Sequence, residues 1–142
     1  MGSLVLVQQD DALVSVLWGV VENPQVTLLL TEAVKQIENY FAGELQQFDL
    51  PLDYQCSAYQ RLICQAMLEI PYGETVTYGD LGTATRSSAQ AVGNACGGNP
   101  LPIIVPCHRV LAADGLGGYS GQGGLETKIA LLKMESTIPW LI

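Results

Sequence analysis

Residues 57–73, SAYQRLICQAMLEIPYG, carry the strongest apolar periodicity in the chain and therefore constrain its fold most. Ser57 and Gln60 form a capping-box pattern where this segment begins, and the PYGE that ends it is typical of a turn. The segment is predicted to be a helix that buries one face in a core. The side chains on that face are Tyr59, Leu62, Ile63, Ala66, Met67 and Ile70.

Two shorter helices are predicted next. TYGDLGTAT has Thr77 as its cap, and residues 89–96 follow two serines and precede Gly-Gly-Asn-Pro. Helices of this length joined by the polar turn TRSS fit a helix-turn-helix with the second helix in the recognition position. Many αα-hairpins in protein cores share this pattern and have no nucleic-acid role, so these residues alone favour the structural interpretation.

The first third of the chain has a different pattern. SLVLVQQ and LVSVLWGVV are β-rich runs separated by DDA, which predicts an antiparallel hairpin. Residues 31–43 predict a helix that is capped by Thr31, stops at Gly43, and buries a face formed by Leu30, Val34, Ile37 and Phe41. ELQQFDLPLDYQC has little periodicity and is interpreted as the connection between two domains. We therefore expect a support domain at 1–56 and a second domain at 57–142.

Composition and charge exclude several classes. Hydrophobic residues make up 49% and charged residues 14% of 142 residues, which argues against disorder, and no apolar run is long enough for a bilayer. The net charge of −8 is uneven: residues 1–56 hold eight acids against Lys35, whereas residues 57–142 hold six acids against five bases. The start lacks the basic segment of a secretory signal. We expect a cytoplasmic protein, or a nuclear one in a eukaryote, that does not bind membranes.

The four cysteines lack CxxC spacing, and only one histidine is available, so no metal site is expected. A chain with a core of this size does not need a disulfide framework either. Cys64 and Cys96 are interpreted as core residues. Cys107 is different, because it directly precedes the only histidine of the chain.

LPIIVPC, residues 101–107, is predicted to be a short buried strand or extended segment, and GGLETKIALLKME a closing helix with Leu125, Ile129 and Leu132 on its inner face. A Gly-rich loop lies between them. In a regular strand Cys107 and His108 would point to opposite faces, so a dyad requires a turn, and Pro106 favours one. His108 could then take the thiol proton directly or through water, with Arg109 adding positive potential and Glu135 orienting the imidazole. A buried structural cysteine is the alternative.

Three longer stretches decide between these interpretations: IPYGETVTYGDLG, AVGNACGGNPLPIIVPCHRV and GGYSGQGGLETKIALL. Over residues 55–135 the chain resembles the O6-alkylguanine-DNA alkyltransferase family. The resemblance implies an α+β fold, in which a small N-terminal antiparallel sheet with a helix precedes a mostly helical lobe containing a helix-turn-helix. It also implies repair of O6-alkylguanine, and of O4-alkylthymine, by single irreversible transfer of the alkyl group to a cysteine, with base flipping and without a cofactor.

The resemblance implies roles for five residues. Cys107 would be the alkyl acceptor, His108 its activator through water, and Glu135 the group that holds the histidine. Asn99 would support the turn, and Tyr78 would rotate the nucleotide and donate a hydrogen bond to the leaving base. A phenol and a thiolate suit this chemistry, because the oxygen must leave protonated and a soft nucleophile must attack carbon.

The resemblance also implies a DNA surface and a substrate pocket. The expected partner is double-stranded DNA with alkylated bases, bound by a monomer through a small-sided helix in the minor groove. The expected DNA-binding residues are Arg86, Gln90, Ala91, Asn94, Ala95 and Arg109. The expected pocket residues are Val105, Pro106, Tyr119 and Ser120.

Two departures from the family pattern concern DNA binding. Gln90 stands where the family usually has an arginine, and Gly97 stands where a second basic residue is often found. We therefore expect weaker DNA binding than is usual for the family. The competing hypotheses are a sensor that binds alkylated DNA without repairing it, a degenerate member with poor access to DNA, and a Cys-His hydrolase or thiol redox enzyme.

Overall fold

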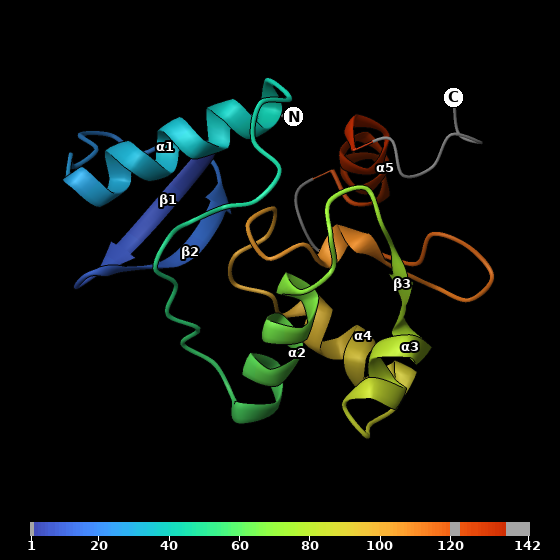
Figure 1. Cartoon of the computed structure of the whole chain (residues 1–142). Coiled ribbons are helices and arrows are strands. Elements are labelled where there is room, and N and C mark those ends of the chain that lie inside the picture. Colours follow the sequence, from blue (N-terminus) through green and yellow to red (C-terminus); the bar gives the residue numbers. More distant parts are fainter. Residues whose placement is uncertain (1, 120–122, 136–142) are drawn as a thin grey trace. The chain divides into compact units, whose positions relative to one another are not determined.

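The computed structural model describes residues 2–119 and 123–135. The chain forms two compact units, residues 1–55 and 56–142. Unit 1 is a two-stranded antiparallel sheet with one helix, and unit 2 is mostly helical (Figure 1). The predicted α+β fold class is confirmed. Among the helices of the described residues, none combines the length and apolar character that a bilayer crossing requires.

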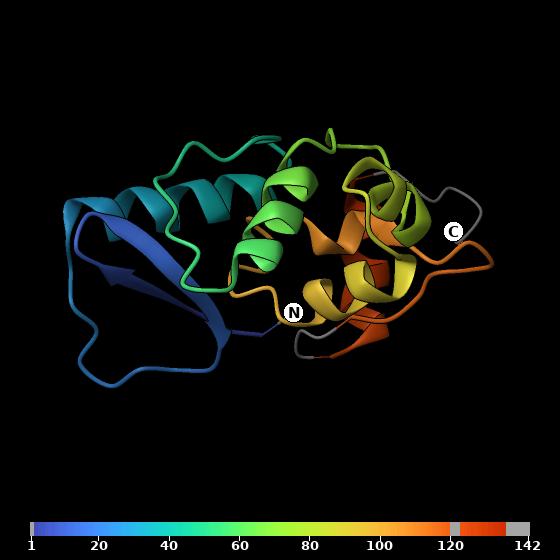
Figure 2. The same ribbon diagram turned by 90° about the horizontal axis from the view of Figure 1, so that it is seen from below.

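Unit 1 begins with the predicted hairpin. Strand β1 (Leu4–Gln9) pairs antiparallel with β2 (Ala12–Trp18), and a bulge interrupts the register between Val7 and Gln8. Helix α1 (Leu28–Phe41) lies alongside the hairpin (Figure 2). Leu13, Val14 and Val16 of β2 supply the buried strand residues of this unit.

Helix α1 begins one turn earlier than predicted. Its N-cap is Thr27 rather than Thr31, because the Thr27 hydroxyl accepts a hydrogen bond from Leu30 N at 3.0 Å. The buried face is consequently rotated: Ala33, Ile37 and Tyr40 are buried, whereas Val34 is 46% exposed. The predicted end is confirmed, since the last helical residue is followed by Ala42 and by Gly43 at φ +78°.

Unit 2 begins with the predicted core helix, α2 (Ala58–Leu68). Ser57 caps it by accepting from Gln60 N at 3.1 Å, but the Gln60 side chain donates to Ala95 O at 3.2 Å instead of completing a capping box. Ile63 and Met67 are buried as predicted, whereas Leu62 is 44% exposed.

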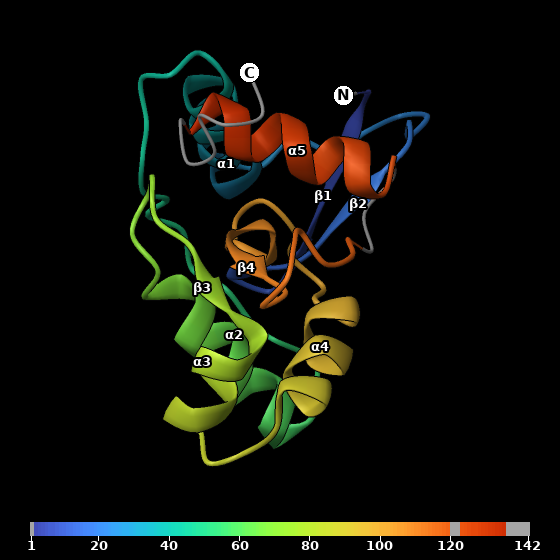
Figure 3. The same ribbon diagram turned by 90° about the vertical axis from the view of Figure 1, so that its right-hand side faces the viewer.

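Helices α3 (Tyr78–Ala84) and α4 (Ala89–Gly97) pack against each other as a helix-turn-helix (Figure 3). Thr77 and Asp80 form a complete capping box at the start of α3, and Ser88 caps α4. The turn between them is tight, because a Cβ at Gly82 would lie 2.9 Å from the Ser88 carbonyl carbon. Both predicted helices are confirmed.

Residues 101–105 are buried but do not form the predicted strand. They fold into a turn closed by a Pro102–Val105 bridge, with Ile103 at φ +74°. Pro102 and Pro106 lack the N–H groups that a strand ladder needs, which explains the turn. Strand β4 (Val110–Leu111) follows and pairs in parallel with β3 (Val76–Thr77). This pairing brings the start of α3 beside the segment that follows Cys107.

The closing helix is α5 (Leu125–Met134), and its buried face differs from the prediction. Leu132 is buried as expected, but Leu125 is 43% exposed and Ile129 is only half-buried. The face that points inward carries Thr127, Lys128, Leu131 and Leu132. The helix therefore buries a polar stripe, which an apolar pattern does not reveal.

Candidate active site

The backbone turns at Cys107, as a Cys-His dyad requires. Pro106 has φ −81° and ψ 66°, the geometry of an inverse γ-turn, and Cys107 N donates to Val105 O at 2.8 Å. A single 3₁₀ turn, η1 (Cys107–Arg109), follows directly. The chain thus changes direction twice within four residues, and the strict alternation of a strand no longer separates the cysteine from the histidine.

Asn99 holds this turn from the side of α4. Its amide Nδ2 donates to Val105 O at 2.9 Å, and its Oδ1 accepts from Leu101 N at 3.0 Å. The Asn99 amide also lowers the pKa of the Cys107 thiol, because a nearby N–H donor favours the thiolate. One buried amide therefore links the loop after α4 to the cysteine.

His108 and Glu135 meet in the interior of unit 2. The imidazole Nε2 lies 2.8 Å from Glu135 Oε2, and both side chains are buried. Burial lowers the pKa of His108, and the hydrogen bond to Glu135 opposes that effect only partly, so the neutral imidazole is favoured. A carboxylate can only accept, so the single proton of the neutral ring sits on Nε2. Nδ1 has no hydrogen-bond partner among the described residues and is left as the basic nitrogen.

Arg109 is hydrogen-bonded to the same carboxylate. Its Nε donates to Glu135 Oε1 at 2.8 Å, its Nη2 to Oε2 at 3.1 Å, and its Nη1 to Ile70 O at 2.8 Å. The guanidinium also lies 5.6 Å from the centre of the Tyr72 ring. Arg109 is only 7% exposed. The expectation that it contacts DNA is therefore wrong: its donors are used inside the protein, where they keep Glu135 ionised.

The positive charge near the cysteine comes instead from Lys128, which the sequence analysis missed. Its Nζ is buried and donates to Val110 O at 2.7 Å and to Gly118 O at 3.0 Å. Burial lowers the pKa of Lys128 to about 8, and its charge in turn lowers the pKa of Cys107. A signal was present in the sequence, because Lys128 lies seven residues, or two helical turns, before Glu135, the residue that caps the end of α5.

Cys107 combines opposing influences. The residue is 5% exposed, and burial raises the pKa of its thiol above the ordinary value, whereas Asn99 and Lys128 lower that pKa. All four cysteines are free thiols. Cys64 and Cys96 are buried as predicted, and burial raises the pKa of each to about 12. Among the four thiols, Cys107 is the one whose pKa is lowered by a side-chain amide and whose sequence neighbour is the histidine.

A pocket of about 440 Å³ opens onto Cys107. Tyr78, Gly118 and Tyr119 line it together with the cysteine. Gly93, Cys96 and Gly97 of α4 form the remaining lining. Tyr119 is thus where the pocket prediction placed it, but Val105 and Pro106 are buried without lining the pocket, and Ser120 lies outside the described residues. The lining from α4 was not predicted as part of the pocket.

Tyr78 lines this pocket, and the glycine loop passes close to its ring. A Cβ at Gly117, which has φ +72°, would lie 2.8 Å from the Tyr78 ring, so only glycine lets the loop pass this close. The Lys128 ammonium lies 5.6 Å from the ring centre. Burial raises the pKa of the Tyr78 phenol, which therefore stays protonated and able to donate a hydrogen bond at neutral pH.

The candidate DNA surface of α4 is only partly as predicted. Gln90 and Asn94 are exposed, Ala91 is half-buried, and Arg86 is exposed in the preceding turn. Ala95 is 7% exposed, and its carbonyl accepts from Gln60, so the expectation that it contacts DNA is wrong. In the described part of the chain, no group of three or more His, Cys, Asp or Glu side chains gathers as a metal site.

Comparison with known proteins covers both units. The family model described as 6-O-methylguanine DNA methyltransferase, DNA binding domain, matches residues 58–137. The model described as 6-O-methylguanine DNA methyltransferase, ribonuclease-like domain, matches residues 1–54. Together the two models account for most of the chain.

Two curated relatives carry the name methylated-DNA--protein-cysteine methyltransferase. The protein of Mycolicibacterium paratuberculosis is 47% identical over 120 residues, which are 82% of this chain and 70% of the relative. That of Mycobacterium tuberculosis is 48% identical over 108 residues, or 74% of this chain and 64% of the relative. The chain thus matches about two thirds of the length of these relatives.

Solved structures agree in fold. The crystal structure of Mycobacterium tuberculosis O6-methylguanine methyltransferase gives a TM-score of 0.81 at 37% identity, covering 96% of this chain and 87% of that one. The crystal structure of Mycobacterium tuberculosis OGT in complex with DNA gives 0.82 at 38% identity, covering 96% and 91%. With both family models matched along the sequence, the chain belongs to the 6-O-methylguanine DNA methyltransferase family.

Proposed function

We propose that this protein repairs DNA by moving an alkyl group from O6 of guanine to Cys107 in a single irreversible turnover, with O4-alkylthymine as a second substrate. The observation that carries the proposal is the position of Cys107. Its thiol lines a pocket of about 440 Å³, and the neighbouring histidine is held by a buried Glu135–Arg109 ion pair. The names of the relatives support the same activity.

The proposed chemical step uses the neutral imidazole as a base. His108 Nδ1 takes the Cys107 proton through a water molecule, and Glu135 stabilises the imidazolium that forms. The thiolate then attacks the alkyl carbon, a carbon–sulfur bond forms, and the carbon–oxygen bond breaks with its electrons on the base. The proton taken from the thiol then passes from the imidazolium through water to the departing guanine, which leaves neutral. The product is an uncharged thioether, which explains why the cysteine does not turn over.

The pocket lining fits an extruded base. We propose that Tyr78 helps to rotate the nucleotide and donates its phenol hydrogen bond to the base as it leaves. Gly93, Gly97 and Gly118 allow main chain to approach the base closely, because they have no side chains. Tyr119 would close the pocket from the glycine loop.

DNA would bind to the α4 side of unit 2. Gln90, Ala91 and Asn94 would enter the minor groove, and Arg86 would contact phosphate. Helix α4 has no Lys or Arg, and unit 1 is strongly acidic, so affinity should be lower and less salt-dependent than in relatives with a basic helix. We further propose that residues 57–142 carry both DNA binding and catalysis, with residues 1–56 as support, and that the protein acts as a monomer. Such a protein would act where the chromosome lies, in the cytoplasm of a bacterium or archaeon.

Mass spectrometry after incubation with an oligonucleotide bearing O6-methylguanine tests the reaction. The expected result is one methyl group on the Cys107 peptide, with one equivalent of guanine restored in the DNA. The Cys107→Ala variant should gain no methyl group, whereas Cys56→Ala should behave as the unaltered protein. Repeated turnover on an ester or amide, without a stable thioether, would identify a hydrolase instead.

The lack of basic residues on α4 also favours a second candidate, a member with a reactive pocket but poor access to DNA. Transfer from free O6-benzylguanine separates the two. A repair protein should react faster with the alkylated oligonucleotide than with the free base. Equal or slower reaction with DNA would support the second candidate, and binding without transfer would support a sensor.

A further inference from the structure

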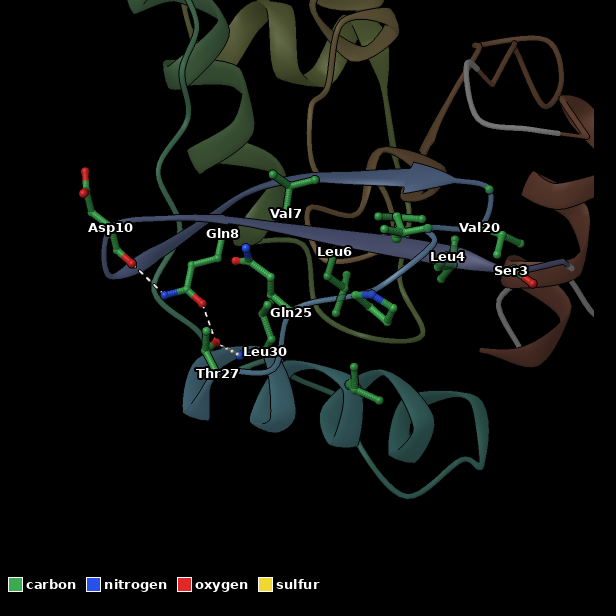
Figure 4. Close-up of a pocket in the computed structure, with 15 residues that line it drawn as sticks. Ser3, Leu4, Leu6, Val7, Gln8, Asp10, Val20, Gln25, Thr27 and Leu30 are labelled. Carbon is green, nitrogen blue, oxygen red and sulfur yellow. Dashed lines mark hydrogen bonds between the residues drawn. The ribbon is translucent and has the colours of Figure 1, made fainter.

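Side-chain hydroxyl groups connect separate elements in both units. In unit 1 the Thr27 hydroxyl accepts from Leu30 N and donates to Gln8 Oε1 at 2.6 Å, which joins the start of α1 to β1 (Figure 4). Unit 2 has a longer connection of this kind, which begins on α2 and ends in the turn between α3 and α4. The reaction proposed for Cys107 gives this second connection no role.

The hydroxyls of Tyr59, Ser87 and Thr85 form this connection, which we call the hydroxyl chain. Tyr59 Oη lies 2.8 Å from Ser87 Oγ, which lies 2.8 Å from Thr85 Oγ1. The Thr85 hydroxyl donates its one proton to Leu81 O at 2.6 Å, so it accepts from Ser87. Ser87 has then used its own proton and accepts from Tyr59. The phenol is therefore the donor at the head of the hydroxyl chain.

The hydroxyl chain encloses Arg86, which lies between two of its members. Thr85 and Ser87 are half-buried and bonded to each other, whereas Arg86 is exposed. Arg86 has φ +56°, in the left-handed region that residues other than glycine rarely adopt. Ser87 N also donates to Gly82 O at 2.7 Å, which closes the turn. A backbone strained in this way persists only where surrounding contacts fix it, and the hydroxyl chain supplies such contacts.

The next residue of α2 holds the opposite end of α4. Gln60 Nε2 donates to Ala95 O at 3.2 Å, and a Cβ at Gly98 would collide with the same amide. The residues of α4 that line the pocket are in this second half of the helix. Loss of the Tyr59 bond should therefore affect the turn before α4 more than the wall of the pocket.

Exposed cations are few in unit 2, so the position of each one matters for DNA binding. All five bases of this unit lie in the described part of the chain, and two of them, Arg109 and Lys128, are buried. The exposed ones are Arg61, Arg86 and Lys133. Because α4 has no Lys or Arg, Arg86 is the cation that adjoins the start of this helix.

We propose that Tyr59 is a positioning residue for DNA binding, which acts through the hydroxyl chain to hold Arg86 where its guanidinium meets a DNA phosphate. The inference rests on the proposed function, because it takes α4 and the turn before it to be the DNA side of unit 2. Without the phenol proton, Ser87 keeps its bond to Thr85 but the turn loses its tie to α2. The backbone of Arg86 is then free to leave the left-handed region, and phosphate binding has to order it again.

Tyr59→Phe removes the phenol oxygen and keeps the ring, so it tests the hydroxyl chain directly. Gel-shift titrations of the full chain with an unmodified duplex, over a range of salt concentrations, should show about fivefold weaker binding. The slope of log affinity against log salt should become less steep, by up to the value of about 0.9 for one phosphate contact. Arg86→Ala should have the same two effects. Combining both changes should add little, because Tyr59 acts through Arg86.

Alkyl transfer from two substrates separates positioning from general damage to the fold. With an alkylated oligonucleotide, Tyr59→Phe should raise the half-saturating DNA concentration about fivefold and leave the limiting rate unchanged. With free O6-benzylguanine its rate should stay within about twofold of the unaltered protein. Ser87→Ala breaks the hydroxyl chain at its next member and should reproduce these results. Tyr40→Phe removes the hydroxyl of a buried tyrosine in unit 1 and should change neither reaction.

The possible outcomes distinguish this inference from the proposed function. An unchanged affinity and salt slope in Tyr59→Phe, or effects of Tyr59→Phe and Arg86→Ala that add in full, would overturn the inference and leave the repair reaction intact. An equal loss of rate with the free base and with DNA would also overturn it, because the hydroxyl chain would then support the fold as a whole. If the unaltered protein transfers no alkyl group from the oligonucleotide, the proposed function fails, and the inference fails with it.

Discussion

His108 and Glu135 are 27 residues apart in the sequence, yet His108 Nε2 lies 2.8 Å from Glu135 Oε2. Arg109, the residue after the histidine, bonds both oxygens of the same carboxylate. The glutamate therefore fixes the imidazole tautomer while the arginine keeps the glutamate ionised. This arrangement makes the carboxylate a positioning group, and its charge is what the first prediction tests.

Glu135→Gln should lower the single-turnover rate of alkyl transfer by about 100-fold or more, because the neutral amide no longer selects the proton on Nε2 or stabilises an imidazolium. The change also leaves Arg109 buried without its counter-ion, which should cost about 3–5 kcal/mol of stability. Rapid-quench kinetics and thermal unfolding measure the two effects. Glu126→Gln, on an exposed position of α5, should change neither. A transfer rate within a few-fold of the unaltered protein would show that Glu135 does not position the base.

Lys128→Met should make the Cys107 thiol less acidic, because it removes the buried cation that lowers the pKa of that thiol. The rate of thiol alkylation by iodoacetamide at neutral pH should fall about tenfold, and its pH profile should move to higher pH. Lys133→Met alters an exposed lysine on the same helix and serves as the control. An unchanged pH profile of alkylation in Lys128→Met would mean that the ammonium only hydrogen-bonds the carbonyls of Val110 and Gly118 and does not act on the thiol.

Lys128 should also make stability depend on alkaline pH. Its pKa is about 8 in the folded protein and 10.5 ordinarily, so between these values the unfolded chain holds more protons than the folded one. Stability then rises with pH in this window, and the cost of burying the charge is fully present below pH 8. Between pH 8 and 10.5, the free energy of unfolding of the unaltered protein should rise by on the order of 3 kcal/mol relative to that of Lys128→Met. Urea unfolding of both proteins at each pH measures the difference, and a constant difference would contradict it.

The sequence predicted the helix starts well where the capping contacts join residues close together in the chain. Thr77 with Asp80 and Ser88 with Ala91 N are contacts between residues three apart, so a cap can be recognised before any fold is known. The start of α1 was predicted wrongly because one of the contacts that fix it is not local. Thr27 is fixed partly by Gln8, a residue 19 positions away on β1, and no local pattern contains that contact.

In the candidate site too, features that depend on neighbouring residues were predicted, and features that depend on distant residues were not. PCHR predicted a turn because proline breaks a ladder, and the structure has one. The use of Arg109 depends on Glu135 and on Ile70, which are 26 and 39 residues away, so its burial could not be predicted from its own surroundings. Lys128 was missed because a lysine in an amphipathic helix is ordinarily solvated, and only tertiary packing places the carbonyls of Val110 and Gly118 around it.

Gln90→Arg should strengthen DNA binding, because it places a cation in the first turn of α4 at an exposed position. One added phosphate contact should steepen the slope of log affinity against log salt by about 0.9. Gel-shift titrations over a range of salt concentrations measure this slope. Gln65→Arg adds the same charge at an exposed position of α2 and distinguishes a contact from a change in net charge. If α4 is the helix that meets DNA, only Gln90→Arg should also raise the rate of transfer from an alkylated oligonucleotide, and both variants should react equally with free O6-benzylguanine. Equal slopes for the two variants would place the DNA on a different face of unit 2.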